Sequence, residues 1–306
     1  MKQNIPNFIQ IDSIEQYHEL LGIEKPLHPL FSIIDFSKIT YSHPQVDTSI
    51  LSNLYNISLK AGTACVMRYG PHHFDFRQGV MSFFKPGQII STNPDAPVVK
   101  EGFTINFHPD FLRTSPLDQK IRHYEFFDYE VNESLFLSDA EKEQCNTIAK
   151  GIETEYLSKI DAYSQEAIVS FIDLLLVYGK RFYDRQFITR QPHQQTFVVQ
   201  FEKLLDAFFK DELSGAYELP NVKYFAEQLN MSPNYLSDLL RIVTGQSAQS
   251  HIQNKLIEEA KRLLSTSKLT VAEIAYKLGF EQPQSLNRLF KKKTELSPLE
   301  FRKLFN

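Results

Sequence analysis

The strongest constraint on the fold of this 306-residue chain is a segment that occurs twice near its C-terminus. With an offset of 49 residues, Val222, Ala226 and Leu229 match Val271, Ala275 and Leu278. With an offset of 50, a second set matches: Pro233, Leu236, Leu239, Thr244 and Ser247 match Pro283, Leu286, Leu289, Thr294 and Ser297. The offset changes inside a loop between two expected helices, where an extra residue disturbs the fold least.

Each copy predicts a short helix, a tight turn and a second helix with an apolar inner face. Ala226 and Ala275 are small, as a close helix crossing requires. Gly279 suits a turn with positive φ, and Asn230 is the next best residue for that conformation. This is the pattern of a duplicated helix-turn-helix, a motif whose second helix docks in the DNA major groove. The helix expected at 248–265 spans about 27 Å, so it can hold the two copies about one DNA turn apart.

The stretches that carry the repeat are VKYFAEQLNMSPNYLSDLLRIVTGQSAQSHI and AEIAYKLGFEQPQSLNRLFKKKTELSPLEFR. Over about 222–304 the chain resembles the AraC family of bacterial transcription regulators. The resemblance implies a compact all-helical DNA-binding domain with two helix-turn-helix units, at about 222–243 and 271–293. It also implies a sensory half upstream, a cupin-like β-barrel followed by dimerising helices.

Residues that would read DNA lie on the second helix of each copy. Arginine can bridge the O6 and N7 atoms of guanine, and glutamine can pair with adenine. Arg288 and Gln284 are therefore the leading candidates. The full set expected at base edges is Asn234, Ser237, Asp238, Gln282, Gln284, Ser285, Asn287 and Arg288. The set expected at phosphates is Tyr235, Arg241, Lys291, Lys292 and Lys293.

Two residues depart from the family pattern. Asp238 stands where many members carry a basic or amide residue, so the first recognition helix is expected to make a weaker or differently specific contact. Glu295 stands where the family often has glycine, as at Gly245, and we expect some strain or a different helix cap there. The KKK run by itself is typical of a solvated helix face, and only its place in the repeat indicates phosphate contact.

The N-terminal part has a different character. Strand-like segments punctuated by turns, the clearest at Pro86-Gly87, occupy about 30–130 and predict an antiparallel sandwich or small barrel. Helices follow at about 138–187, the first opened by a Ser138–Glu141 capping box. The expected organisation is α+β: a β-rich effector and dimerisation domain at 1–188, a polar linker at 189–195, and a helical domain at 196–306. Helices in that last domain are expected at about 196–210, 222–229, 233–243, 248–265, 271–278, 283–293 and 298–304.

Two further surfaces are predicted in the N-terminal part. An apolar stripe on the second helix could pack within the chain or pair two copies, and it comprises Ile168, Phe171, Ile172, Leu175 and Phe182. Polar residues near a strand end could hydrogen-bond an effector, and they are Arg68, Tyr69, His72 and His73. The alternative is that these four are rim residues without a ligand.

Charge and motifs narrow the function. Residues 222–306 hold 13 Lys and Arg against 8 Asp and Glu, whereas the other residues hold 20 against 29. This asymmetry indicates a basic binding module joined to an acidic partner domain. His72 and His73 are adjacent and would point to opposite faces of a strand, and no cupin-spaced ligand set, P-loop or nucleophile motif occurs. We expect no catalysis, no metal and no other cofactor.

The combined prediction is a cytoplasmic, dimeric regulator with double-stranded DNA as its partner. A small-molecule effector and, for an activator, RNA polymerase are implied as further partners. The chain has no apolar leader or membrane-length run, and Cys65 and Cys145 form no CxxC pair. Two alternatives remain open. One is a cupin-type metalloenzyme with a helical appendage. The other is a protein-binding adaptor whose DNA binding is abolished by Asp238 and by the modest charge balance of +5 in residues 222–306.

Overall fold

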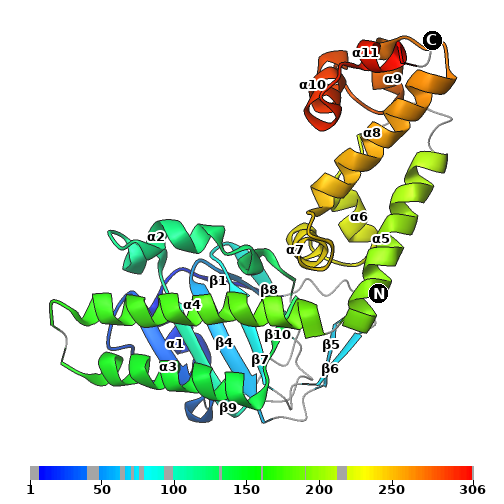
Figure 1. The fold of residues 1–306 in the computed structure, drawn as a ribbon. Helices are drawn as coiled ribbons and strands as arrows, with labels where there is room; N and C mark the ends of the chain where they lie inside the picture. Colours follow the sequence, from blue (N-terminus) through cyan, green and yellow to red (C-terminus); the bar gives the residue numbers. More distant parts are fainter. Residues whose placement is uncertain are drawn as a thin grey trace. The chain divides into compact units, whose positions relative to one another are not determined.

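The computed structural model describes residues 7–39, 48–62, 66–69, 72–75, 79–92, 99–130, 133–159, 161–189, 191–211 and 219–304. The chain divides into two compact units, Met1–Gln186 and Phe187–Asn306. The first contains the strands with flanking helices, and the second is helical where it is described (Figure 1). The mixed α and β content of the predicted fold class is confirmed.

The described strands of the first unit form three sheets. Their bounds are β1 Asn7–Ile11, β2 Phe31–Asp35, β3 Thr48–Ser52, β4 Tyr55–Ala61, β5 Val66–Tyr69, β6 His72–Asp75, β7 Val80–Phe84, β8 Gln88–Thr92, β9 Glu101–Phe107 and β10 Leu135–Phe136. Five strands pair in the order β10-β7-β4-β9-β2, three in the order β1-β3-β8, and β5 pairs with β6. The Pro86-Gly87 turn lies between β7 and β8 as predicted, with Gly87 at φ 84°.

The predicted cupin-like barrel is not confirmed. Among the described strands no pairing closes the five-stranded sheet onto the three-stranded one. The β1–β3 pair is parallel, whereas the turn pattern predicted an antiparallel arrangement throughout. Turn residues indicate only how neighbouring strands connect, and β1 pairs with a strand that follows it by about forty residues.

The two faces of the five-stranded sheet differ in polarity. Ile57 and Leu59 of β4 alternate with Asn56 and Ser58, as side chains on opposite faces of a strand must. Ile57 and Leu59 are fully buried. On the polar face, Asn56 Nδ2 donates to Thr104 Oγ1 at 2.8 Å, and Ser58 Oγ donates to the same oxygen at 3.0 Å. These bonds satisfy buried polar groups that would otherwise destabilise the fold.

Two long helices, α3 (Asp139–Leu157) and α4 (Ser164–Thr189), lie across the five-stranded sheet (Figure 1). The approach is close, because a Cβ added at Gly179 of α4 would come within 2.8 Å of the Phe83 ring. The predicted capping box is confirmed, with Ser138 accepting from the backbone N–H of Glu141 and Glu141 accepting from that of Ser138. Cys145 is a buried free thiol on α3, and burial raises its pKa to about 12.

The apolar stripe of α4 packs inside the first unit, which corrects its use as a surface for pairing two copies. Ile172 and Leu175 are fully buried, Ile168 and Phe182 are nearly so, and Phe171 packs against Gly151 of α3. The exposed apolar side chains of this helix include Leu174, 44% exposed, and Val177, 45% exposed. Helical spacing identified an apolar stripe, but it could not distinguish a core from an interface.

The second unit is built around a central helix. Its helices are α5 Gln191–Asp211, α6 Val222–Gln228, α7 Pro233–Thr244, α8 Ala248–Thr266, α9 Val271–Lys277, α10 Pro283–Thr294 and α11 Pro298–Arg302. These bounds agree closely with the predicted helices, except that residues 191–195 of the predicted linker belong to α5. Ile252, Leu256 and Ala260 of α8 are buried. Phe201 of α5 makes an edge contact with Phe225 of α6, and Arg302 of α11 donates to the Leu269 carbonyl at 2.6 Å.

Candidate nucleic-acid interface

The turn between α6 and α7 has the same hydrogen bonds as the turn between α9 and α10. The backbone N–H of Met231 donates to the Ala226 carbonyl at 2.9 Å, and that of Phe280 donates to the Ala275 carbonyl at 3.0 Å. These bonds belong to a Schellman cap, which needs a left-handed residue just before the donor. Asn230 takes that role at φ 54° and Gly279 at φ 84°, as predicted from the sequence.

The ends of α7 and α10 also repeat each other. Gly245 closes α7 at φ 79°, and Glu295 closes α10 at φ 64°. Thr244 donates its hydroxyl to the Leu240 carbonyl at 2.7 Å, and Thr294 does the same to Phe290 at 2.8 Å. Glu295 therefore adopts the left-handed conformation of its glycine counterpart, and the expected strain at this cap follows from its Cβ.

The helix α10 places its apolar and polar residues on different faces. Leu286 and Phe290 are fully buried. The predicted base-contact residues of this copy, Gln282, Gln284, Ser285, Asn287 and Arg288, are all exposed. The structure thus brings these five side chains to one end of an exposed helix, where their donors and acceptors can reach another molecule.

The helix α7 presents a different surface at the matching positions. Asn234, Ser237 and Asp238 are only partly exposed. The Asp238 carboxylate pairs with the Arg241 guanidinium at 2.5 Å, one helical turn away. This ion pair holds the positive charge of Arg241 beside a negative one, so α7 has less free positive charge than α10. Tyr235, predicted at a phosphate, is also half-buried.

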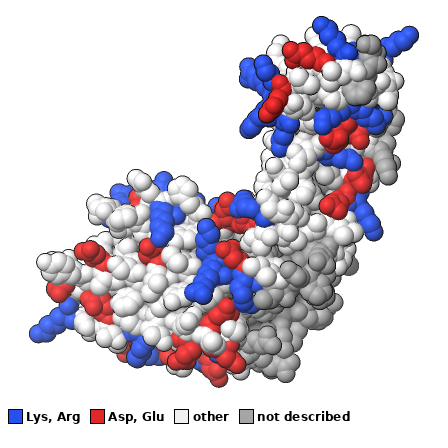
Figure 2. All heavy atoms as spheres, in the orientation of Figure 1, with Lys and Arg blue, Asp and Glu red and all other residues white. Residues whose placement is uncertain are grey.

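The three lysines at the end of α10 are exposed, and Figure 2 shows blue side chains gathered where Figure 1 places this helix. Lys293 Nζ donates to Asn254 Oδ1 at 2.8 Å, and Asn254 Nδ2 donates to Gln246 Oε1 at 2.8 Å. This chain of bonds links the end of α10 to the start of α8. The sequence analysis did not identify Asn254 and Gln246, because an amide on a helix and an amide in a short loop form no motif.

The predicted effector-site residues lie elsewhere in the chain. The side chains of Arg68, Tyr69, His72 and His73 fall outside the described residues, although β5 and β6 pair through their backbones. Over the described residues, no group of three or more His, Cys, Asp or Glu side chains could hold a metal ion. Within the same ranges no helix is both long and apolar enough to cross a membrane.

Comparison with known proteins bears on this helical region. Residues 225–304 match the family described as "Helix-turn-helix domain". The arabinose operon regulatory protein of Salmonella typhimurium is 39% identical over 95 residues, which cover 31% of this chain and 33% of that protein. Its Escherichia coli counterpart is 39% identical over 77 residues, covering 25% and 26%. Residues 225–304 form an AraC-type helix-turn-helix domain.

The match to these curated relatives spans a third of their length or less. The Msm operon regulatory protein of Streptococcus mutans is 28% identical over 109 residues, covering 36% of this chain and 37% of that protein. A solved structure, the DNA-binding domain of AdpA in complex with a target DNA, is 27% identical at a TM-score of 0.29, covering 33% of this chain and 91% of that one. Each of these similarities covers little more than a third of this chain or less.

Proposed function

We propose that this protein is a sequence-specific DNA-binding transcription regulator of AraC type. The observation that carries the proposal is the exposed polar face of α10, with Gln284, Ser285 and Arg288 set opposite the buried Leu286 and Phe290. The match of residues 225–304 to a helix-turn-helix domain supports it. So does the 39% identity to the two arabinose operon regulatory proteins over 95 and 77 residues.

In the proposed complex α10 lies in the major groove. Arg288 would bridge the O6 and N7 atoms of a guanine, and Gln284 would pair with an adenine. Lys291, Lys292 and Lys293 would contact phosphates, which position a protein on DNA without reading its sequence. The helix pair α6–α7 would act as a second helix-turn-helix unit. The 19-residue α8 separates the pairs by about 28 Å at 1.5 Å per residue, close to one turn of DNA.

The two units would contribute unequally. Arg241 is paired with Asp238, and a carboxylate near phosphates opposes binding unless it accepts a hydrogen bond from a cytosine amino group. Most of the affinity and its salt dependence would therefore come from α10. This asymmetry also bears on the adaptor alternative, in which Asp238 abolishes DNA binding altogether.

We further propose that the protein acts in the cytoplasm as an effector-responsive dimer. Dimerisation would join two operator half-sites and raise the apparent affinity through effective concentration. Leu174 and Val177, both exposed on α4, are the candidate contact residues, since the buried stripe of the same helix is occupied. For an activator, RNA polymerase would be a further partner. We propose no catalytic role and no bound metal or other cofactor. A metal analysis finding about one ion per chain would instead favour the metalloenzyme alternative.

The test is selection of genomic DNA fragments by the purified full chain at about 50 and 200 mM salt, where phosphate contacts change affinity strongly. The selection is repeated with Arg288→Ala and with Lys180→Ala, which removes an exposed charge from α4 in the first unit. Wild type and Lys180→Ala should enrich one spaced pair of motifs, and Arg288→Ala should lose one half of it. Equal, weak and unselective binding by all three proteins would reject the regulator function.

A further inference from the structure

A cavity of the first unit lies at the free edge of the five-stranded sheet. This cavity of about 610 Å³ is enclosed by the loop after α1 (Ile14–Leu21), by the edge strand β2 and by the last turns of α3. This volume is within the range of small-molecule sites in proteins, about 300–1,000 Å³. The cavity involves none of the four residues that the sequence placed at an effector site.

The loop wall of the cavity is held in place by a buried histidine. His18 Nδ1 donates to the Glu24 carbonyl oxygen at 2.5 Å, and its Nε2 accepts from the Ser32 hydroxyl at 2.7 Å. Gly22 turns the chain out of α1 at φ 63°. These contacts fix the loop against β2, so the cavity is built by the fold and does not depend on a loose surface segment.

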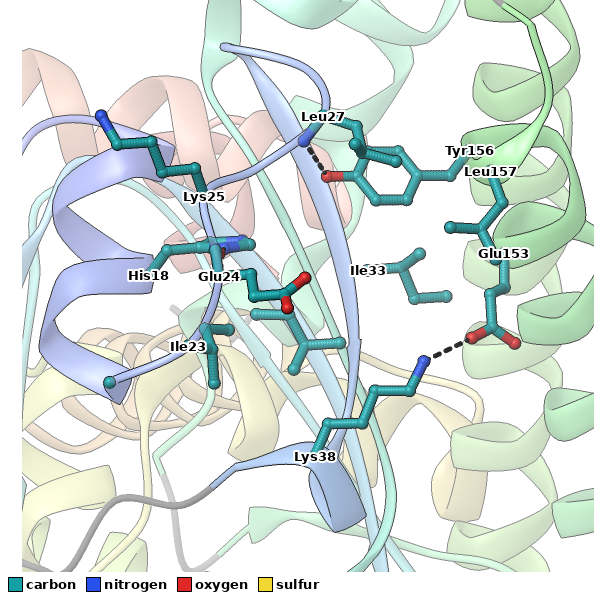
Figure 3. Close-up of a pocket in the computed structure, with 12 residues that line it drawn as sticks. His18, Ile23, Glu24, Lys25, Leu27, Ile33, Lys38, Glu153, Tyr156 and Leu157 are labelled. Carbon is teal, nitrogen blue, oxygen red and sulfur yellow. Dashed lines mark hydrogen bonds and ion pairs between the residues drawn. The ribbon is translucent and has the colours of Figure 1, made fainter.

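The interior of the cavity is largely apolar. Its apolar lining residues include Ile23, Ile33, Leu27 and Leu157 (Figure 3), and Ile34. Leu27 is 58% exposed and Leu157 is 62% exposed. Two large apolar side chains left in water at one opening would be covered by the apolar body of a ligand, and this burial is favourable.

The side of the cavity opposite the loop carries the Lys38 ammonium, the Glu153 carboxylate and the Tyr156 hydroxyl, and Lys150, which does not line the cavity, also contacts Glu153. Lys38 Nζ lies 3.1 Å from Glu153 Oε1, and Lys150 Nζ lies 3.0 Å from Glu153 Oε2. Hydrogen bonds from these two lysines hold the pKa of Glu153 below its usual value. The Glu153 carboxylate thus forms ion pairs with two ammonium groups. The Tyr156 hydroxyl accepts from the Leu27 N–H at 2.8 Å, and among the described contacts its own hydrogen is not donated.

The loop side of the cavity carries a carboxylate. Figure 3 shows the Glu24 side chain and the Lys38 side chain both directed into the space between the loop and α3. The neighbouring Lys25 is engaged with Glu15 at 2.8 Å. Within the described residues no lysine or arginine forms an ion pair with Glu24. The cavity therefore has a negative group on one wall, a positive group on the other, and apolar side chains between them.

We propose that this cavity binds a small apolar zwitterion, a molecule with an ammonium, a carboxylate and an apolar body between or beside them. Free amino acids with large apolar side chains and short apolar peptides share this chemistry. The ligand carboxylate would meet Lys38 and the Tyr156 hydroxyl, its ammonium would meet Glu24, and its apolar body would cover Leu27 and Leu157. Charge-assisted hydrogen bonds of this kind are among the stronger polar contacts in proteins.

The test is calorimetric titration of the full chain, without DNA, with two probes: L-phenylalanine and the dipeptide leucyl-phenylalanine. Each probe is compared with its N-acetylated amide, which keeps the apolar body and removes both charges. The variants are Lys38→Gln and Glu24→Gln, whose side chains are well exposed, with folding checked by circular dichroism. The control is Lys85→Gln, which breaks a lysine–aspartate pair with Asp128 at residues that do not line the cavity.

At least one free zwitterion should bind with one site per chain, and the tighter probe identifies the amino acid or the peptide as the better source. Its capped form should bind about tenfold more weakly or worse, as should each cavity variant with the free probe. Lys85→Gln should bind like wild type. No saturable binding at millimolar concentration overturns the proposal. The proposal is also overturned if the free and capped probes bind with equal affinity, or if Lys38→Gln and Glu24→Gln both bind the free probe as tightly as Lys85→Gln does. Since no DNA is present, failure here is separate from failure of the regulator function.

Discussion

The helix pairs α6–α7 and α9–α10 have the same backbone but different surfaces. Their turns share one hydrogen-bond pattern, and their second helices end in the same left-handed cap. Yet glycine occupies the turn in one pair and the cap in the other, at Gly279 and Gly245. At the position that matches the exposed Arg288 of α10, α7 carries Asp238, which pairs with Arg241. The repeat therefore preserves what the backbone needs and varies what faces outward.

The largest effects should come from the shared core, and they should be equal in the two pairs. Leu236 and Leu286 occupy matching positions and are both fully buried. Leu236→Ala and Leu286→Ala should each lower the free energy of unfolding by about 2–5 kcal/mol, measured by urea denaturation followed by circular dichroism. Leu299→Ala, at a site 61% exposed, is the control and should change it little. A large loss in only one of the two pairs would show that the pairs do not share one core.

The next largest effect concerns the difference in charge between α7 and α10. Asp238→Asn removes the carboxylate that pairs with Arg241, so the negative charge beside Arg241 is lost and the net charge of α7 rises by one. The DNA affinity should rise by about tenfold or less, and the slope of log K against log salt should steepen by about one phosphate contact. Fluorescence anisotropy on the selected fragment measures both quantities. If affinity falls and preference at one base pair changes, Asp238 accepts a hydrogen bond from cytosine instead.

A smaller effect is expected at the helix caps. Glu295→Gly should raise the free energy of unfolding by about 0.5–1 kcal/mol, because glycine adopts φ 64° without the clash of a Cβ. Gly245→Glu should lower it by a similar amount. The stability of both variants is measured by chemical denaturation, and the control is Lys268→Gln at an exposed position of the loop before α9. An unchanged stability in Glu295→Gly would show that this cap carries no strain.

The smallest effect should appear on acidification, and only in the second pair. Hydrogen bonds from the Thr270 backbone and hydroxyl hold the pKa of Glu273 below its usual value of 4.5. A lowered folded-state pKa means that this cap stabilises the fold above pH 4.5 and loses its contribution as the pH falls through the lower value. Asn221 caps α6 with an amide and does not titrate. Unfolding curves between pH 6 and 3 should therefore become less pH-dependent in Glu273→Gln, whereas Asn221→Ala should leave the pH dependence unchanged.

Local signals explain why the second unit was well predicted. Thr270 and Ser297 both cap helices of this unit with a glutamate three residues later, and such contacts are made within one turn of chain. The first unit was predicted less well because its strands pair over long distances. The β1 strand and the helix α1 were not predicted, and the expected barrel did not take account of a parallel pair.

The two candidate sites also differ in whether local sequence patterns could predict them. The exposure of Arg288 and its neighbours follows from a helical period that places Leu286 and Phe290 on the opposite face, so the sequence was sufficient. The cavity beside β2 could not be predicted, because it joins Lys38 to Glu153 across 115 positions of chain. Neither residue belongs to a motif. Whether the apolar stripe of α4 is buried within the chain or exposed also depends on the segments that pack against it.

The sequence by itself determined the two helix pairs, their turns, their caps and the exposed polar face of α10. Each of these depends on residues separated by three to five positions, where backbone geometry decides which side chains meet. Only the tertiary structure decided that Ile172 and Leu175 face the interior, that the sheets stay open among the described strands, and that Glu24 and Lys38 face one cavity. Those outcomes depend on packing between distant segments, which a local pattern does not encode.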